Sequence, residues 1–214
     1  GAVGEAPSAG GLAVVTLESN LTGHRCDDVV PALQAKGWMV CGDAAKAATG
    51  GQIVGPDYLA VSFYKLFGAP TGLGALLAKN PTLLTLGKRE FGYFGGGAVS
   101  RVSSTRVEWE VVRDDFPGAF HDGTPHFRGI AQLQFGFAAL DRVGGLEQVA
   151  RHAGGLADEL ADRLKSLATV YERRRGSSLV CFNVLRDDGS AVSPATGARY
   201  LLDECNVVVR AGCL

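Results

Sequence analysis

Short apolar segments alternate with segments of helical periodicity near the start of the chain, and this alternation constrains the fold most. The segments GLAVVTLE (11–18), WMVCGD (38–43) and YLAVS (58–62) have the length and composition of β-strands. Between the first two, DDVVPALQAKG (27–37) has the spacing of a short amphipathic helix. Strands that alternate with helices favour an α/β architecture.

A further apolar segment, LGALLA (73–78), follows YLAVS (58–62) after a Gly/Pro-rich turn. The connection is too short for the crossover that joins parallel strands, so we expect these two strands to pair antiparallel. Gly72 and Gly74 would let the backbone turn and pack closely.

The rest of the chain changes character twice. Residues 87–123 are rich in glycine and irregular, whereas residues 128–145 have a helical period that 146–168 continue as a long amphipathic helix, weakened by two glycines. The segments 177–190 and 206–212 return to strands and a turn. We therefore expect a large domain over 1–145, a connecting helix over 146–169 and the start of a second domain over 170–214.

Composition excludes several functions. The chain has 214 residues with 21 basic and 22 acidic side chains, a net charge of −1, which gives no basis for binding nucleic acid or an anionic membrane. The short basic cluster Arg173–Arg175, followed by Gly176, predicts a solvated turn. The five cysteines include no CxxC pair, so we expect neither a metal site nor a disulfide framework.

We expect a cytoplasmic protein. No segment approaches the roughly 18 to 20 apolar residues of a membrane helix, and the first residues, GAVGEAPSAGG, lack the basic start and apolar middle of a signal peptide. The first residue is not methionine and the last residues are VVVRAGCL, which suggests a fragment.

One lysine interrupts the apolar segment YLAVSFYKLFG. Lys65 is surrounded in sequence by Val61, Phe63, Tyr64 and Leu66, so we expect it to be enclosed, and burying its charge would cost several kcal/mol, roughly, unless it is paired or neutral. A neutral lysine amine acts as a nucleophile or condenses with an aldehyde.

Asp43 and Lys65 each lie at the carboxyl end of an expected strand, where open α/β sheets bind ligands. An acid and an amine at that edge suit pyridoxal 5'-phosphate, because the amine holds the aldehyde and the acid keeps the ring nitrogen protonated. The alternative is that Asp43 only caps the segment that follows it.

Several segments resemble molybdenum cofactor sulfurases, which belong to the cysteine-desulfurase-like branch of the class V, fold type I pyridoxal-phosphate enzymes. They are, in chain order, DAA from Asp43, SFYK from Ser62 to Lys65 with LFGAPTGLGALLAKN after it, FGGG, DGTP with Thr124, FNVL, and RAGC from Arg210. The resemblance implies the fold class: an α/β chain containing part of the fold type I large domain, a mostly parallel sheet flanked by helices, and the beginning of the small C-terminal domain.

The resemblance also implies roles for single residues. Lys65 looks like the lysine that carries the cofactor, and Asp43 like the partner of its ring nitrogen. Ser62 resembles the serine that contacts the cofactor's phosphate, and Asn20 an asparagine near its phenolic oxygen, although Asn20 is also ordinary turn chemistry. Lys46 departs from the pattern, because relatives often have a small or amide residue there.

Two more residues follow from the resemblance. Thr124 matches a threonine that reaches the phosphate of the neighbouring subunit's cofactor, which implies a homodimer. Arg210 resembles the arginine that binds the carboxylate of L-cysteine, its alternative being a surface arginine at the end of a strand.

Sulfurases move sulfur from L-cysteine to a thiolate of the enzyme and then to the molybdenum cofactor, which they hold through a C-terminal domain absent from this sequence. By register with the family, the attacking thiol is expected directly after Leu214, so Cys213 looks like its neighbour. Cys26, Cys41, Cys181 and Cys205 are expected to be buried apolar residues.

Three alternatives stay open. The chain could be another class V cysteine desulfurase or aminotransferase, although Tyr64 stands where desulfurases usually have histidine. It could be a non-catalytic dimerising domain of the same fold. The match of Ser62-x-x-Lys65 to serine acyl enzymes is the weakest alternative, because the S-D-N and K-T-G elements of those enzymes do not occur.

Overall fold

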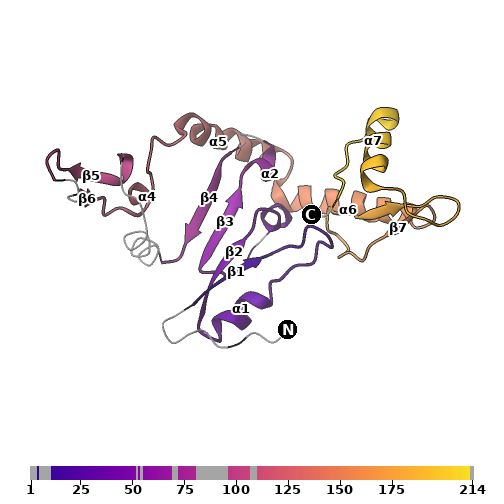
Figure 1. The fold of residues 1–214 in the computed structure, drawn as a ribbon, viewed down its shortest axis with the longest axis horizontal. Coiled ribbons are helices and arrows are strands. Elements are labelled where there is room, and N and C mark those ends of the chain that lie inside the picture. The colour runs from indigo at the N-terminus through magenta and orange to yellow at the C-terminus, as the bar shows by residue number, and fades with distance from the viewer. Residues whose placement is uncertain are drawn as a thin grey trace.

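The computed structural model describes residues 4, 11–51, 53, 55–68, 72–80, 96–106 and 110–212. Its central feature is a four-stranded sheet with the strand order β1-β2-β3-β4. The strands are β1 (Gly11–Thr16), β2 (Trp38–Asp43), β3 (Tyr58–Ser62) and β4 (Gly74–Ala78). In Figure 1 this sheet lies in the middle of the molecule.

The sheet is parallel except at one edge. β1 pairs with β2 and β2 with β3 in parallel, whereas β4 returns antiparallel to β3 with Ser62 opposite Gly74. The expected antiparallel pairing is therefore confirmed. Gly74 is required for it, because a Cβ atom there would lie 2.5 Å from the carbonyl oxygen of Val61.

The hydrophobic core lies between the sheet and the segments that follow its first strands. Helix α1 (Val29–Gln34) directs Val30 and Leu33 into it, and the 3₁₀ helix η1 (Ala47–Gly50) contributes two alanines. The buried members are Leu17, Val30, Leu33, Val40, Ala44, Ala47 and Ala48. Fully burying side chains the size of leucine or valine stabilises the fold by about 1.5–3 kcal/mol each.

Two long helices follow, α5 (Phe127–Arg142) and α6 (Gly145–Leu164). The sequence predicted a helical period over 128–145 that 146–168 continue, and the structure divides it into these two helices between Arg142 and Gly145. The chain turns at Gly144, whose φ of 90° lies in the left-handed region that residues other than glycine rarely adopt. Helix α5 packs on the four-residue helix α2 (Tyr64–Phe67), which follows β3.

The two ends of the molecule carry smaller units (Figure 1). At one end, a hairpin and two short helices occupy residues expected to be irregular: η2 (Gly96–Ala98), β5 (Val99–Val102), β6 (Glu110–Val112) and α4 (Phe116–Ala119). At the other end lie β7 (Ala168–Val170), β8 (Phe182–Val184) and α7 (Pro194–Cys205).

Strands β7 and β8 pair antiparallel, so the expectation of a strand within 177–190 is confirmed. The strand expected over 206–212 is wrong, because those residues are irregular. A strand needs a partner for its backbone hydrogen bonds, and none pairs with this segment in the described part of the chain. Among the described residues, no helix is both long and apolar enough to cross a membrane.

Candidate functional site

Three adjacent parallel strands end at one edge of the sheet, and predicted site residues follow each of them. Asp43 is the last residue of β2 and lies in register with Thr16 of β1 and Ala60 of β3. Ser62 ends β3, and Asn20 lies four residues after the end of β1. Neighbouring strands are about 4.8 Å apart, so the sheet brings these chain segments together.

The Asp43 side chain is exposed and makes one local hydrogen bond. Its Oδ1 atom accepts from the backbone N–H of Ala45 at 2.9 Å. This is the turn contact that the capping alternative expected. It occupies only one oxygen, and no other hydrogen bond or ion pair to the carboxylate occurs in the described residues. The other oxygen of Asp43 can therefore still accept a hydrogen bond from a protonated ring nitrogen.

Lys65 is not enclosed as the sequence suggested. It lies on α2 with an exposed side chain, and its Nζ atom is 6.0 Å from the ring centroid of Tyr64. In a helix of 3.6 residues per turn, the residues flanking Lys65 point in other directions. The predicted aromatic enclosure of this amine is wrong for the described chain.

The aromatic residues near Lys65 instead fix α2 to α5. Phe63 and Phe67 stack at 6.3 Å between ring centroids, and Phe137 meets Phe67 edge-on at 5.2 Å. Gly136 makes room for this contact, because a Cβ atom there would overlap the Phe67 ring. The cluster holds the helix that carries Lys65, although it does not cover the amine.

Asn20 lies exposed in a tight turn of residues 19–24, here called the Asn20 turn. The isolated bridge between Glu18 and Arg25 closes it, and the backbone N–H of Ser19 donates to the carbonyl of His24 at 2.9 Å. The Ser19 hydroxyl accepts from the N–H groups of Leu21 and Thr22, both at 3.2 Å. These bonds present the Asn20 amide at the edge of the sheet.

A buried acid, which the sequence does not predict, lies below this turn. Glu18 is only 2% exposed, and its Oε1 atom lies 3.9 Å from Lys46 Nζ, 4.0 Å from Arg174 Nη2 and 3.5 Å from the Ser177 hydroxyl. Its Oε2 atom has no hydrogen-bond partner in the described residues. The one sequence signal was a carboxylate at the end of the apolar segment GLAVVTLE (11–18), directly after Leu17, which is buried.

Lys46 is a second amine near the predicted site. Its side chain is 17% exposed, and its Nζ atom donates to the Ser178 hydroxyl at 2.7 Å. Burial lowers the pKa of Lys46; Glu18 opposes this shift, and the positive charges of Arg174 and Lys65 add to it. Lys46 and Lys65 are thus close enough to interact electrostatically.

The predicted solvated turn over Arg173–Arg175 is wrong for Arg173, whereas the Arg175 side chain is 68% exposed, as expected, and that of Arg174 is 37% exposed. The Arg173 side chain is 8% exposed and donates to Asp158 of α6 and to the carbonyl of Ser177. Hydrogen bonding from Arg173, and then from the Gly176 N–H, lowers the pKa of Asp158. Residues 173–178, here called the arginine turn, therefore pack between α6 and the Asn20 turn.

Thr124 lies away from the other predicted residues. It lines a cavity of about 450 Å³ with Arg113 and His121, in the unit built around η2 and α4. Figure 1 places that unit at the opposite end of the molecule from β7 and α7. Asp43 and Lys65 are not among the residues that line this cavity.

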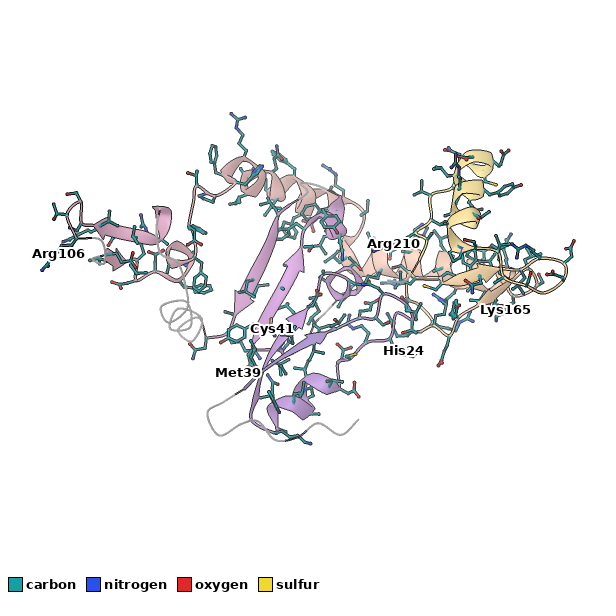
Figure 2. The ribbon with its side chains drawn as sticks, in the orientation of Figure 1. His24, Met39, Cys41, Arg106, Lys165 and Arg210 are labelled. Carbon is teal, nitrogen blue, oxygen red and sulfur yellow. The ribbon has the colours of Figure 1, made fainter. Side chains whose placement is uncertain are left out.

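Arg210 is exposed in the irregular segment after α7. In the view of Figure 2 it lies between the four-stranded sheet and α7. Cys26, Cys41 and Cys181 are half-buried, whereas Cys205 is exposed, which corrects its expected burial. Burial raises the pKa of the Cys41 and Cys181 thiols, so neither fits a reactive thiolate. Cys213 lies outside the described residues.

The donor set at the sheet edge fits pyridoxal 5'-phosphate. The aldehyde needs an amine, the ring nitrogen an acid and the phosphate a hydroxyl donor; Lys65, Asp43 and Ser62 supply these groups at the ends of two neighbouring strands. No group of His, Cys, Asp and Glu in the described residues could hold a metal ion.

Comparison with known proteins gives a family match over nearly the whole chain. The model of the family "Aminotransferase class-V" matches residues 9–213. Among solved structures, a cysteine desulfurase from Thermococcus onnurineus superposes with a TM-score of 0.72 at 25% identity, covering 93% of this chain and 49% of that one.

Curated relatives carry a more specific name. A molybdenum cofactor sulfurase from Caenorhabditis elegans is 34% identical over an alignment of 198 residues that covers 83% of this chain and 27% of that protein. Molybdenum cofactor sulfurase 2 from Culex quinquefasciatus is 36% identical over an alignment of 179 residues that covers 74% of this chain and 23% of that protein. The chain thus spans about a quarter of the length of these relatives.

Proposed function

This chain belongs to the class V aminotransferase family, and from that premise we propose that its protein uses pyridoxal 5'-phosphate to transfer sulfur from L-cysteine to the molybdenum cofactor. The observation that carries the proposal is the arrangement of Asp43 and Lys65 after neighbouring parallel strands. The relatives named molybdenum cofactor sulfurase, at 34% and 36% identity, support the choice of reaction.

The chain's own residues divide the work. The Lys65 amine holds the cofactor's aldehyde carbon and, once free, removes the proton from the α-carbon of cysteine. The Asp43 carboxylate keeps a proton on the ring nitrogen, and the Ser62 hydroxyl and the Asn20 amide bind the phosphate and the phenolic oxygen. When bound, the cofactor supplies a ring that accepts the electrons released at the α-carbon.

The exposure of Lys65 in this chain fits a site that other surfaces complete. A second copy is proposed to supply Thr124 to the cofactor's phosphate, which makes the active form a homodimer. Arg210 is proposed to bind the carboxylate of cysteine, because a guanidinium matches two carboxylate oxygens. The thiolate that takes up sulfur is assigned to neither Cys41 nor Cys181, since burial raises the pKa of both.

The test is to find which residue carries the cofactor and to measure the release of alanine. In the full-length protein, borohydride reduction and mass spectrometry should find the cofactor on Lys65, and Lys65→Ala should abolish both this adduct and alanine release. Lys46→Ala is the matched control, because Lys46 is the other amine near the site and should leave the adduct at Lys65. Alanine release at the wild-type rate from Lys65→Ala would contradict the proposal.

A second candidate function is that of an ordinary cysteine desulfurase, which the structural similarity to the Thermococcus onnurineus enzyme favours. The two candidate functions differ in the molecule that accepts the sulfur. A sulfurase should convert molybdenum cofactor that lacks its sulfido ligand into the sulfurated form. Alanine release without that conversion would favour the desulfurase.

A further inference from the structure

The arginine turn and the Asn20 turn are joined directly, although about 150 residues separate them in sequence. The backbone N–H of Arg174 donates to the carbonyl of Thr22 at 2.8 Å, and its side-chain Nε–H donates to the carbonyl of Gly23 at 2.7 Å. One residue therefore holds two consecutive carbonyls of the Asn20 turn. Hydrogen bonds from a guanidinium are among the stronger ones in proteins.

The fit between the two turns is close. Gly23 has a φ of 66°, and a Cβ atom there would overlap the hydroxyl of Ser177. The same hydroxyl faces the buried carboxylate of Glu18 at 3.5 Å. The Asn20 turn thus rests on the arginine turn with no room for another side chain at Gly23.

The arginine turn is itself anchored from the opposite side. Arg173 and the backbone N–H of Gly176 bind Asp158 on α6. The turn therefore cannot move without breaking contacts to a 20-residue helix. It connects α6 to the turn that carries a predicted cofactor contact.

We propose that Arg174 is a positioning residue that holds the Asn20 turn, and with it the Asn20 amide, at the edge of the sheet. It does so through the hydrogen bond from its Nε–H to the Gly23 carbonyl. The attraction between its positive charge and Glu18 is a separate interaction, which does not position the turn. The positioning of the turn follows from the contacts of Arg174 with Thr22 and Gly23, whereas the consequence for cofactor binding rests on the proposed function.

Amide hydrogen exchange of the cofactor-free, full-length protein tests the positioning role. In Arg174→Ala the amides of Leu21, Thr22 and Gly23 should exchange at least about tenfold faster, because the turn loses a bond to a charged donor. Arg175→Ala is the matched control, since Arg175 binds Asp158 and Asp162 on α6 and should leave these amides unchanged.

Arg174→Lys distinguishes the effect of the hydrogen bond to Gly23 from the effect of the positive charge beside Glu18. Lysine keeps the cation beside Glu18 but lacks the Nε–H and planar geometry of arginine, so exchange in the Asn20 turn should stay fast. Unchanged exchange in Arg174→Ala, or wild-type exchange in Arg174→Lys, would overturn the inference. If Arg174→Ala fails to fold, the lysine variant decides alone.

Titration with pyridoxal 5'-phosphate then distinguishes the proposed function from the positioning role of Arg174. The dissociation constant should rise at least about fivefold in Arg174→Lys and stay at the wild-type value in Arg175→Ala. If the wild-type protein binds no cofactor, the proposed function fails, and the exchange measurement still decides the role of Arg174. If the wild type binds the cofactor and Arg174→Lys and Arg175→Ala both bind it with the wild-type dissociation constant, the proposed effect of Arg174 on cofactor binding is wrong.

Discussion

Gly154 of α6 lies directly against Gly176 of the arginine turn, so closely that a Cβ atom at Gly154 would overlap the Gly176 carbonyl. The next residue, Gly155, has open space where its Cβ would be. Helix propensity alone predicts that both glycines weaken the helix. The structure shows that one of them is needed for packing and the other is not.

These two glycines should respond in opposite ways to alanine. Gly154→Ala should lower the free energy of unfolding by about 1–3 kcal/mol, because backbone must move to admit the methyl group. Gly155→Ala should raise it by roughly 0.5–1 kcal/mol through better helix propensity. Urea unfolding measures both, and equal effects at the two positions would show that α6 does not pack on the arginine turn as described.

Asp162 should make stability depend on pH in the acid range. Hydrogen bonds from Lys165 at 2.7 Å and Arg175 at 3.1 Å lower the pKa of its carboxyl from 3.8 to about 2. The folded protein then keeps the carboxylate charged where the unfolded chain binds a proton. The resulting stabilisation is complete above about pH 4 and is lost as the pH falls toward 2.

The melting temperatures of the wild type and Asp162→Asn test this sign. Their difference should be largest near about pH 5 and should shrink toward pH 2, and about 1 M salt should also reduce it because the pair is exposed. Glu147→Gln, in the first turn of the same helix, is the control. A difference that grows on acidification would contradict the assignment.

Glu18 and Lys46 should be energetically coupled. Glu18→Gln should cost about 3 kcal/mol of unfolding free energy, because it leaves two cations facing each other in a largely buried place. Lys46→Met removes one of those cations, so the double variant should be more stable than the sum of the single effects predicts, by about 1 kcal/mol or more. Strict additivity in the four-variant cycle would show that this ion pair carries no net coupling.

The aromatic cluster should hold the helix that carries Lys65. Phe137→Ala removes the edge-on contacts to Phe63 and Phe67 and should lower the free energy of unfolding by about 0.5–1.5 kcal/mol, the range for aromatic pairs, because Phe137 is itself 43% exposed. Phe135→Ala, at a position that is 67% exposed, should change it by less than about 0.5 kcal/mol. Equal losses from the two variants in thermal unfolding would contradict the role given to Phe137.

Apolar patterning along the chain was enough to predict the four-stranded sheet and the sequence in which its strands occur. Apolar runs of strand length and the short Gly/Pro connection fixed the strands and the antiparallel return of β4. The sequence also located Asp43, Ser62 and Lys65 at strand ends, because the carboxyl ends of parallel strands meet at one edge. The motifs around these residues led to the family that the comparison then showed.

The surroundings of those residues depend on tertiary packing and could not be predicted from the sequence. The amine of Lys65 is exposed although its sequence neighbours are apolar, and Arg173 is buried against α6 although three adjacent charges suggested solvent. Local periodicity reports which face of an element is apolar, but not which distant segment covers it. The contact of Arg174 with Gly23 joins residues about 150 positions apart, and no short-range pattern encodes such a pair.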